Sequence, residues 1–177
     1  YSDRGLLYAA LTWATLARQV QAVPVATVTD WPAYPVRGVI EGFYGPPWSP
    51  ADRLNQVAFY PWVKMNTYVY APKDDPYHRE KWRDLYPDTD LQRLAELVQL
   101  ANHYQVDFVF AISPGLSVVF SSDADFEKLV AKTEQLRAIG VHRFALLLDD
   151  IPKTLDSAAD RVRFRNDVGA AQAFLVN

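Results

Sequence analysis

From residue 36 onward, short apolar runs alternate with longer segments whose apolar residues recur at helical spacing. This pattern predicts strands at 36–41, 66–71, 106–112 and 142–148, each followed by a loop and a helix. Strands that alternate with helices form parallel sheets, because each helix returns the chain to the edge from which the next strand starts. The sequence therefore predicts an α/β fold with four βα units.

Capping residues mark the helices of these units. Ser49 and Pro50 predict an N-cap and a first helical residue. A second helix is expected from Leu91, a third ends at Gly140, and the last begins near Asp156 or Ser157. The second helix places Leu94, Val98 and Ala101 on one side, and the third carries Phe126, Leu129, Val130, Thr133 and Leu136.

Residues 1–35 do not follow this repeat. We expect a helix over 5–17, a strand over 25–28 and a linker over 31–35, together forming the C-terminal end of a preceding α/β domain. The first helix superficially resembles a signal peptide, but Arg18 and Gln19 close its apolar run before a small-residue cleavage site. The run is also shorter than the roughly 20 residues that span a bilayer. The residues predicted to form its buried face are Leu6, Leu7, Ala10, Leu11, Ala14 and Leu16.

The number of βα units suggests part of a larger fold. A complete (β/α)8 barrel needs about 250 residues, whereas positions 36–177 hold four units. We therefore expect residues 36–177 to be the first half of a TIM-type (β/α)8 barrel that works with the missing half. The loops after the strands hold most of the unusual residues, which is where such folds place their sites.

Composition narrows the possible partners of the chain. The 177 residues are 50% hydrophobic and 14% aromatic, enough for a sizeable core. A net charge of −3 without a basic cluster argues against nucleic acid, and no apolar stretch suits a membrane. The sequence contains no cysteine, which excludes disulfides, zinc thiolate sites and thiol nucleophiles but assigns no compartment.

Asp149 and Asp150 directly follow the apolar run 144–148. Neighbouring side chains on a strand point to opposite faces, so the two acids can address one ligand only where the strand gives way to its loop. Two carboxyls that act as nucleophile and acid on a glycosidic bond lie about 5 Å apart across the sugar, which an adjacent pair supplies poorly. One acid and one helper fit the pair better. A helix cap or a divalent-cation site is the alternative interpretation.

Two other loops carry candidate binding residues. The loop 41–48 combines glycines at 42 and 45 with aromatic residues and prolines, a combination that suits a rigid wall for a sugar ring or, alternatively, a tight turn. Lys73 can donate to sugar hydroxyls or to an anion, or form a surface ion pair with a neighbouring aspartate. His78, in the same charged loop, is interpreted as structural. The histidines show no metal-binding spacing, and we expect neither a metal nor a cofactor.

Four segments together resemble one known family. RGVIEGFYGPPWS (37–49), KMNTYVYAPKDDPYHREKWRDLYP (64–87), FVFAISPG (108–115) and GVHRFALLLDDI (140–151) occur in the order found in the family 84 glycoside hydrolases. These are the O-GlcNAcases and related bacterial β-N-acetylglucosaminidases, some of them described as hyaluronidases. The resemblance covers residues 36 to about 177, and the first 35 residues look like the end of the domain that precedes the barrel in this family.

The resemblance implies a function and a role for each candidate residue. The family removes β-linked N-acetylglucosamine with retention by a substrate-assisted route, in which the 2-acetamido oxygen attacks the anomeric carbon and forms an oxazoline. It implies that Asp149 orients the acetamido group and stabilises the oxazoline, and that Asp150 is the general acid and then the general base. Gly42 matches a glycine of the family whose backbone meets the sugar, and Lys73 matches a lysine that contacts the sugar hydroxyls. The resemblance also implies that Tyr44 lines the side of the pocket where the leaving group lies. No cofactor is implied.

Two functional hypotheses remain open for these 177 residues. The intact pair Asp149 and Asp150, with Gly42 and Lys73, favours half of a barrel that hydrolyses N-acetylglucosaminides, the O-GlcNAc of protein Ser/Thr or related glycans. The remaining sugar-binding residues of the family are expected from later barrel units, which favours a catalytically silent fragment or a sugar-binding or structural module. A chitinase-like barrel is disfavoured because the carboxylates are adjacent in sequence.

Overall fold

A four-stranded parallel sheet forms the centre of the computed structural model, which describes residues 2–19, 22 and 25–177. The strands lie in sequence order, each paired with the next. The predicted parallel α/β arrangement is confirmed, and every strand lies inside its predicted range. The strands are β1 (Gly38–Glu41), β2 (Thr67–Tyr70), β3 (Asp107–Ile112) and β4 (Arg143–Leu146).

The fourth strand is shorter than predicted. It ends at Leu146 rather than at 148, although the Leu147 N–H still donates to the Ile112 carbonyl at 2.8 Å. Residues 147–150 are not part of a strand, so the acid pair lies in a loop and not at the end of the strand itself. This loop is what frees the two acids from the alternating directions of strand side chains.

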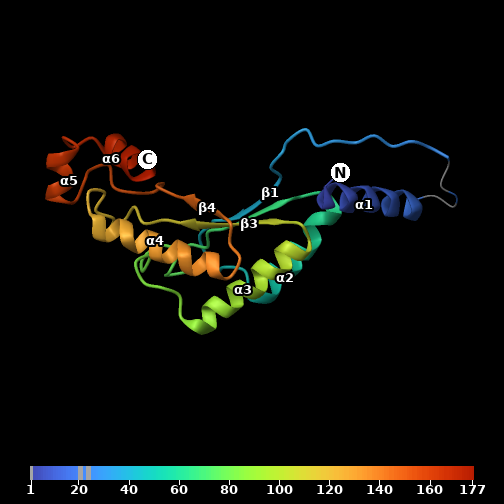
Figure 1. Ribbon diagram of the computed structural model, residues 1–177, viewed down its shortest axis with the longest axis horizontal. Helices are drawn as coiled ribbons and strands as arrows, with labels where there is room; N and C mark the ends of the chain where they lie inside the picture. The colour runs from blue at the N-terminus through green and yellow to red at the C-terminus, as the bar shows by residue number, and fades with distance from the viewer. Residues whose placement is uncertain (1, 20–21, 23–24) are drawn as a thin grey trace.

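Helices α2, α3 and α4 lie along the same side of the sheet (Figure 1). Ser49 caps α2 through a capping box, as predicted. Ser157 caps α5, which begins at Ala158, close to the predicted start near Asp156 or Ser157. Helix α3 begins at Asp88, three residues before the predicted start. The helices after β1 are α2 (Pro50–Phe59), the short 3-10 helix η1 (Tyr60–Val63), α3 (Asp88–His103), α4 (Asp123–Ala138), α5 (Ala158–Arg163) and α6 (Val168–Val176).

The core lies between the sheet and these helices. Tyr70 of β2 stacks on Phe110 of β3, directly opposite it in the sheet register, with ring centroids 5.8 Å apart. Val98 of α3 and Leu136 of α4 are fully buried in the same cluster. On the opposite face of the sheet the register aligns Ile40, Val69 and Val109, and Ile40 is 63% exposed. The helix-facing side of the sheet is therefore the aromatic core.

Helix α1 (Asp3–Gln19) confirms the predicted helix but not its predicted buried face. None of its residues is buried, and Leu6, Ala10 and Leu16 are exposed, while Leu7, Leu11 and Ala14 are half-buried. The helix is held to the end of the sheet largely by polar groups, because Arg4 pairs with Asp107 at 2.9 Å and the Tyr8 hydroxyl donates to the Met65 carbonyl at 3.2 Å.

The strand predicted at 25–28 is wrong. This segment has no regular structure, and Val28 is 56% exposed. Within the described residues no backbone hydrogen bond joins it to the sheet, and β-branched residues form a strand only where a partner strand pairs with them. The assignment of residues 1–35 to a preceding domain stays a prediction, and residues 1, 20, 21, 23 and 24 of that segment lie outside the described part of the chain.

Helix α4 buries an unexpected set of residues. Phe126 and Val130, two of the apolar residues noted from the sequence, are 55% and 43% exposed. The buried residues are Asp125, Lys132 and Leu136, so the covered face of α4 is partly charged. Elsewhere in the fold, no helix among the described residues is long and apolar enough to cross a membrane.

Candidate active site

Four of the predicted site residues meet in the loops that follow β1, β2 and β4. The Lys73 ammonium lies 3.5 Å from Oδ2 of Asp149, and the Tyr44 hydroxyl donates to Oδ2 of Asp150 at 2.9 Å. The Lys73 nitrogen also lies 5.7 Å from the centre of the Tyr44 ring. Each carboxylate of the adjacent pair is therefore held by a donor from a different βα loop.

The backbone at the acid pair has an unusual conformation. Asp150 has φ 52°, in the left-handed region that aspartate tolerates better than most residues. Directly after it, Ile151 packs on Gly115 so closely that a Cβ added to Gly115 would lie 2.4 Å from Cγ2 of Ile151. Because Gly115 has no side chain, it leaves room for Ile151 and so for the chain that follows Asp150.

Lys73 is the most enclosed member of the cluster. Its side chain is 6% exposed, whereas that of Asp149 is 57% exposed. The ion pair predicted as an alternative exists, but its acid is Asp149, 76 positions away, rather than a neighbouring aspartate. A buried stem with its charged end at an open carboxylate suits a group that faces a ligand.

Arg79 joins the cluster and was not identified from the sequence. Its Nη1 lies 3.4 Å from the Tyr44 hydroxyl, which itself donates to Asp150. Arg79 therefore extends the contacts of the acid pair by one residue. The sequence signal was only its place in the charged loop that also holds Lys73.

Gly42 directly follows β1 and remains apart from the charged cluster. A Cβ at this position would lie 3.2 Å from the Ile40 side chain and 3.9 Å from the Ala71 carbonyl. In the described part of the chain no hydrogen bond joins Gly42 to the acid pair. Its predicted contact with a sugar stays a prediction.

The loop that carries Tyr44 is anchored by Glu41, another residue that sequence reasoning missed. Glu41 is 1% exposed and accepts two hydrogen bonds of 2.8 Å from Arg53, one from the Tyr68 hydroxyl and one of 3.1 Å from the Trp48 N–H. Burial alone would lower the pKa of Arg53, but the hydrogen bonds and the charge of Glu41 outweigh it and raise that pKa. Glu41 thus fixes both ends of the loop 41–48.

His78 has the structural role predicted for it. It is fully buried, its Nδ1 lies 2.6 Å from the Ala111 carbonyl, and its own carbonyl accepts from the Ser113 N–H. Burial lowers the pKa of the His78 imidazole, which favours the neutral ring. These bonds attach the loop after β2 to the end of β3.

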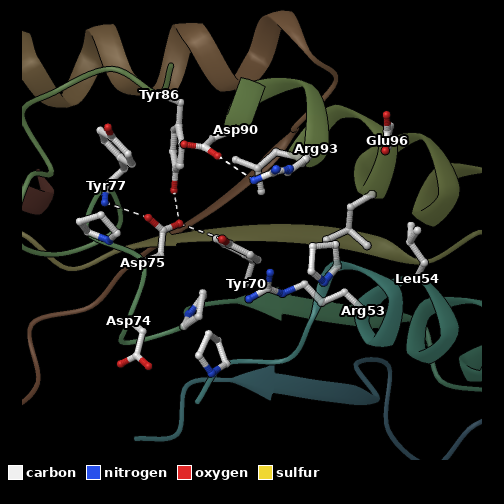
Figure 2. Close-up of a pocket in the computed structure, with 16 residues that line it drawn as sticks. Arg53, Leu54, Tyr70, Asp74, Asp75, Tyr77, Tyr86, Asp90, Arg93 and Glu96 are labelled. Carbon is white, nitrogen blue, oxygen red and sulfur yellow. Dashed lines mark hydrogen bonds and ion pairs between the residues drawn. The ribbon is translucent and has the colours of Figure 1, made fainter. Parts of the chain in front are cut away.

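A cavity of about 290 Å³ lies between α2, α3 and the loop after β2 (Figure 2). None of the five predicted site residues lines it, so it is separate from the acid pair. Nor do the residues that the structure describes include a group of three or more His, Asp or Glu side chains arranged to hold a metal ion. At the acid pair itself, two carboxylates, a lysine and a tyrosine are in place to form hydrogen bonds and to transfer protons.

Comparison with known proteins gives a family for this arrangement. A family model described as beta-N-acetylglucosaminidase matches residues 37–177. The chain belongs to this family. The resemblance found in the four sequence segments is therefore confirmed.

Members of the β-N-acetylglucosaminidase family are similar to this chain in sequence and in structure. The proteins named Protein O-GlcNAcase from Rattus norvegicus and Mus musculus are each 39% identical over 140 residues, which are 79% of this chain and 15% of the relative. An O-GlcNAc hydrolase mutant from Thermobaculum terrenum is 41% identical with a TM-score of 0.77, covering 81% of this chain and 31% of that one. The structure of CpGH84B is 47% identical with a TM-score of 0.73, covering 84% and 24%.

Proposed function

We propose that this chain supplies the acid/base part of an active site that hydrolyses β-linked N-acetylglucosamine, such as O-GlcNAc on Ser or Thr of proteins, with retention of configuration. In this proposal residues 36–177 are the first four units of a TIM-type (β/α)8 barrel, and residues 1–35 are the end of a preceding domain. The parallel sheet and the family membership support the proposal. The chain spans only 15% of the length of its curated relatives. In this proposal the rest of the sugar pocket therefore comes from further barrel units.

One observation carries the proposal. Asp149 and Asp150 are adjacent, and each has its own donor, Lys73 and Tyr44. Two adjacent carboxylates are poorly placed to flank a glycosidic bond as nucleophile and acid, but they can serve a reaction in which the substrate provides the nucleophile. Separate donors support separate roles, one acid facing the acetamido group and the other facing the leaving group.

In the first step the 2-acetamido oxygen forms a bond to the anomeric carbon while the bond from that carbon to the aglycone oxygen breaks. Asp149 accepts a hydrogen bond from the acetamido N–H and stabilises the positive charge that develops on the oxazoline. Asp150 gives its proton to the aglycone oxygen. Because Oδ2 of Asp150 accepts from Tyr44, the proton that is transferred belongs on Oδ1.

In the second step water attacks the anomeric carbon and opens the oxazoline. Asp150 takes the proton from that water, and the acetamido group is restored together with the β configuration. Lys73 and Gly42 line the sugar side of this pocket, Lys73 as a donor to sugar hydroxyls and Gly42 through its backbone, and Tyr44 lines the leaving-group side. No step requires a cofactor.

Two substitutions in the full-length protein test the proposal. With Asp150→Asn, hydrolysis of alkyl N-acetylglucosaminides should fall far more than that of activated aryl glycosides, because a good leaving group scarcely needs protonation. Asp149→Asn should slow both substrates, and a thiazoline mimic of the oxazoline should bind the variant much more weakly than the wild type. Asp156→Asn, at an exposed acid six residues on, is the matched control and should be neutral. Equal losses on both substrates with Asp150→Asn, or a covalent glycosyl ester on Asp149, would contradict the proposal.

A further inference from the structure

The ammonium of Lys132 is buried in the contact between α4 and the loop after β2. Lys132 is 0% exposed, although it lies in the middle of α4 and belongs to one of the residue types that proteins bury least often. A buried cation is costly unless the structure supplies partners for it. The partners of Lys132 therefore indicate what this lysine is for.

All of these partners come from the Lys73 loop, which we define as residues 72–87. The Lys132 nitrogen donates to the Tyr77 carbonyl at 3.0 Å and lies 5.4 Å from the centre of the Tyr77 ring and 4.5 Å from that of Tyr86. The two rings are themselves 4.9 Å apart. A cation between two aromatic faces with one carbonyl acceptor is a favourable arrangement for a buried ammonium.

The same two tyrosines hold Asp75, which lies two residues after Lys73. The Tyr86 hydroxyl donates to Asp75 at 2.6 Å, the Tyr70 hydroxyl at 2.8 Å, and the Tyr77 N–H at 2.8 Å (Figure 2). A continuous set of contacts thus leads from Lys132 through Tyr77 and Tyr86 to Asp75. Lys73, the lysine that contacts Asp149, lies two residues before Asp75 in the same loop.

Other polar residues of α4 hold only the far end of this loop. Gln135 bonds to both the N–H and the carbonyl of Tyr86 at 2.9 Å, and Asp125 pairs with Arg83 at 2.6 Å. Lys132 reaches Tyr77, which lies between Lys73 and Arg79, the two residues of this loop that contact the acid cluster. Gln135 and Asp125 therefore contact the loop at Tyr86 and Arg83, whereas Lys132 also contacts it at Tyr77, next to the residues that reach the acid pair.

We propose that Lys132 is a positioning residue for the reaction: through Tyr77, Tyr86 and Asp75 its buried ammonium holds Lys73 against Asp149. This inference rests on the proposed function of the acid pair. Lys132 itself touches no substrate. Burial lowers the pKa of Lys132 to about 8, and the carboxylates of Asp75 and Asp84 oppose that shift, so the group is a cation at neutral pH.

A double-mutant cycle in the full-length protein tests the proposal. Lys132→Met should lower kcat/KM on an aryl β-N-acetylglucosaminide about tenfold or more, because small misplacements of a site residue cost that much in rate. Since Lys132 acts through Lys73, adding Lys132→Met to Lys73→Met should cause little further loss. Full multiplication of the two losses would overturn the proposal. Lys128→Met, at an exposed lysine one turn earlier on α4, is the matched control and should be neutral.

Hydrogen exchange supplies a readout that does not depend on activity. In Lys132→Met the backbone amides of residues 74–79 should exchange faster than in the wild type, while those of β3 keep their protection. Unchanged exchange at 74–79 would overturn the proposed role of Lys132, whatever the activity of the wild type. An inactive wild type would instead contradict the proposed function of the acid pair. If Lys132→Met fails to fold, both measurements are made on Lys132→Gln instead. This variant removes the charge but keeps a donor for the Tyr77 carbonyl.

Discussion

The Tyr44 hydroxyl donates a 2.9 Å hydrogen bond to Oδ2 of Asp150, across 106 positions of sequence. The bond joins the loop after the first strand to the loop after the fourth, and Tyr44 is otherwise 66% exposed. An exposed tyrosine that contacts an acid on one side and Arg79 on the other is placed to orient that acid rather than to fill the core.

Replacing Tyr44 with phenylalanine should therefore affect the protonation step. The variant keeps the ring beside Lys73 but removes the hydroxyl that fixes Asp150, so kcat/KM should fall about tenfold on substrates with poor leaving groups and less on activated aryl glycosides. A series of aryl N-acetylglucosaminides of graded leaving-group pKa measures this. Tyr34→Phe, at a tyrosine that is 73% exposed, is the control, and a loss independent of the leaving group would contradict the assignment.

Gly115→Ala should disturb the acid pair from the opposite side. The new methyl would lie 2.4 Å from Cγ2 of Ile151, directly after Asp150, so the segment must shift at a cost of about 1–3 kcal/mol. We expect a lower melting temperature and a kcat reduced about tenfold. Gly5→Ala, at an exposed glycine of α1, should leave both quantities at or above their wild-type values. Full activity of Gly115→Ala would show that the position of Ile151 does not matter.

Glu41→Gln should destabilise the fold. It removes the charge that neutralises Arg53, whose side chain is 14% exposed, and leaves that cation without its carboxylate. The expected loss is about 3 kcal/mol in the free energy of unfolding, measured by urea denaturation. Glu96→Gln, on the exposed part of α3, should change it by less than about 0.5 kcal/mol. A loss as small as that of the control would mean that the buried pair contributes little.

The buried Lys132 predicts an unusual dependence of stability on pH. Burial lowers its pKa in the folded state to about 8 from 10.5, while Asp75 and Asp84 oppose the shift. Between these two values the unfolded chain binds more protons than the folded one, so the Lys132 contribution to stability rises with pH and is flat below pH 8. Relative to Lys132→Met, the wild-type free energy of unfolding should rise by about 2 kcal/mol from pH 7.5 to pH 10. Urea titrations of both proteins at the two pH values check this, and a constant difference would contradict it.

Chelation tests the alternative interpretation of the acid pair. The proposed mechanism uses only proton transfer and hydrogen bonding, so activity of the full-length protein should survive EDTA. Loss of activity that a single added metal restores would favour a cation bound by Asp149 and Asp150.

Much of the sheet could be predicted because its signals are local. Apolar runs placed all four strands, and Ser49 and Ser157 marked helix starts through bonds to backbone groups three residues away. The segment 25–28 and the face of α1 were wrong for the same reason, since a residue's own pattern does not say which partner will cover it.

Only part of the candidate site could be predicted from local sequence signals. Tyr44, Lys73, Asp149 and Asp150 carried signals in their motifs, and the structure brings them together. The roles of Arg79 and Lys132 depend on contacts between distant segments, and local patterns gave only weak signals for them. One signal for Lys132 was present, since it lies three residues after Leu129 and four before Leu136, on the stripe that α4 turns inward.

The sheet order β1-β2-β3-β4 also bears on how the protein is made. Because each strand pairs with the one synthesised just before it, the sheet can grow unit by unit as the chain leaves the ribosome. The loop of Tyr44 and the loop of Lys73 emerge first, and helix α4, with Lys132, emerges before the two aspartates. Tyr44, Lys73 and Lys132 are therefore all translated before Asp149 and Asp150.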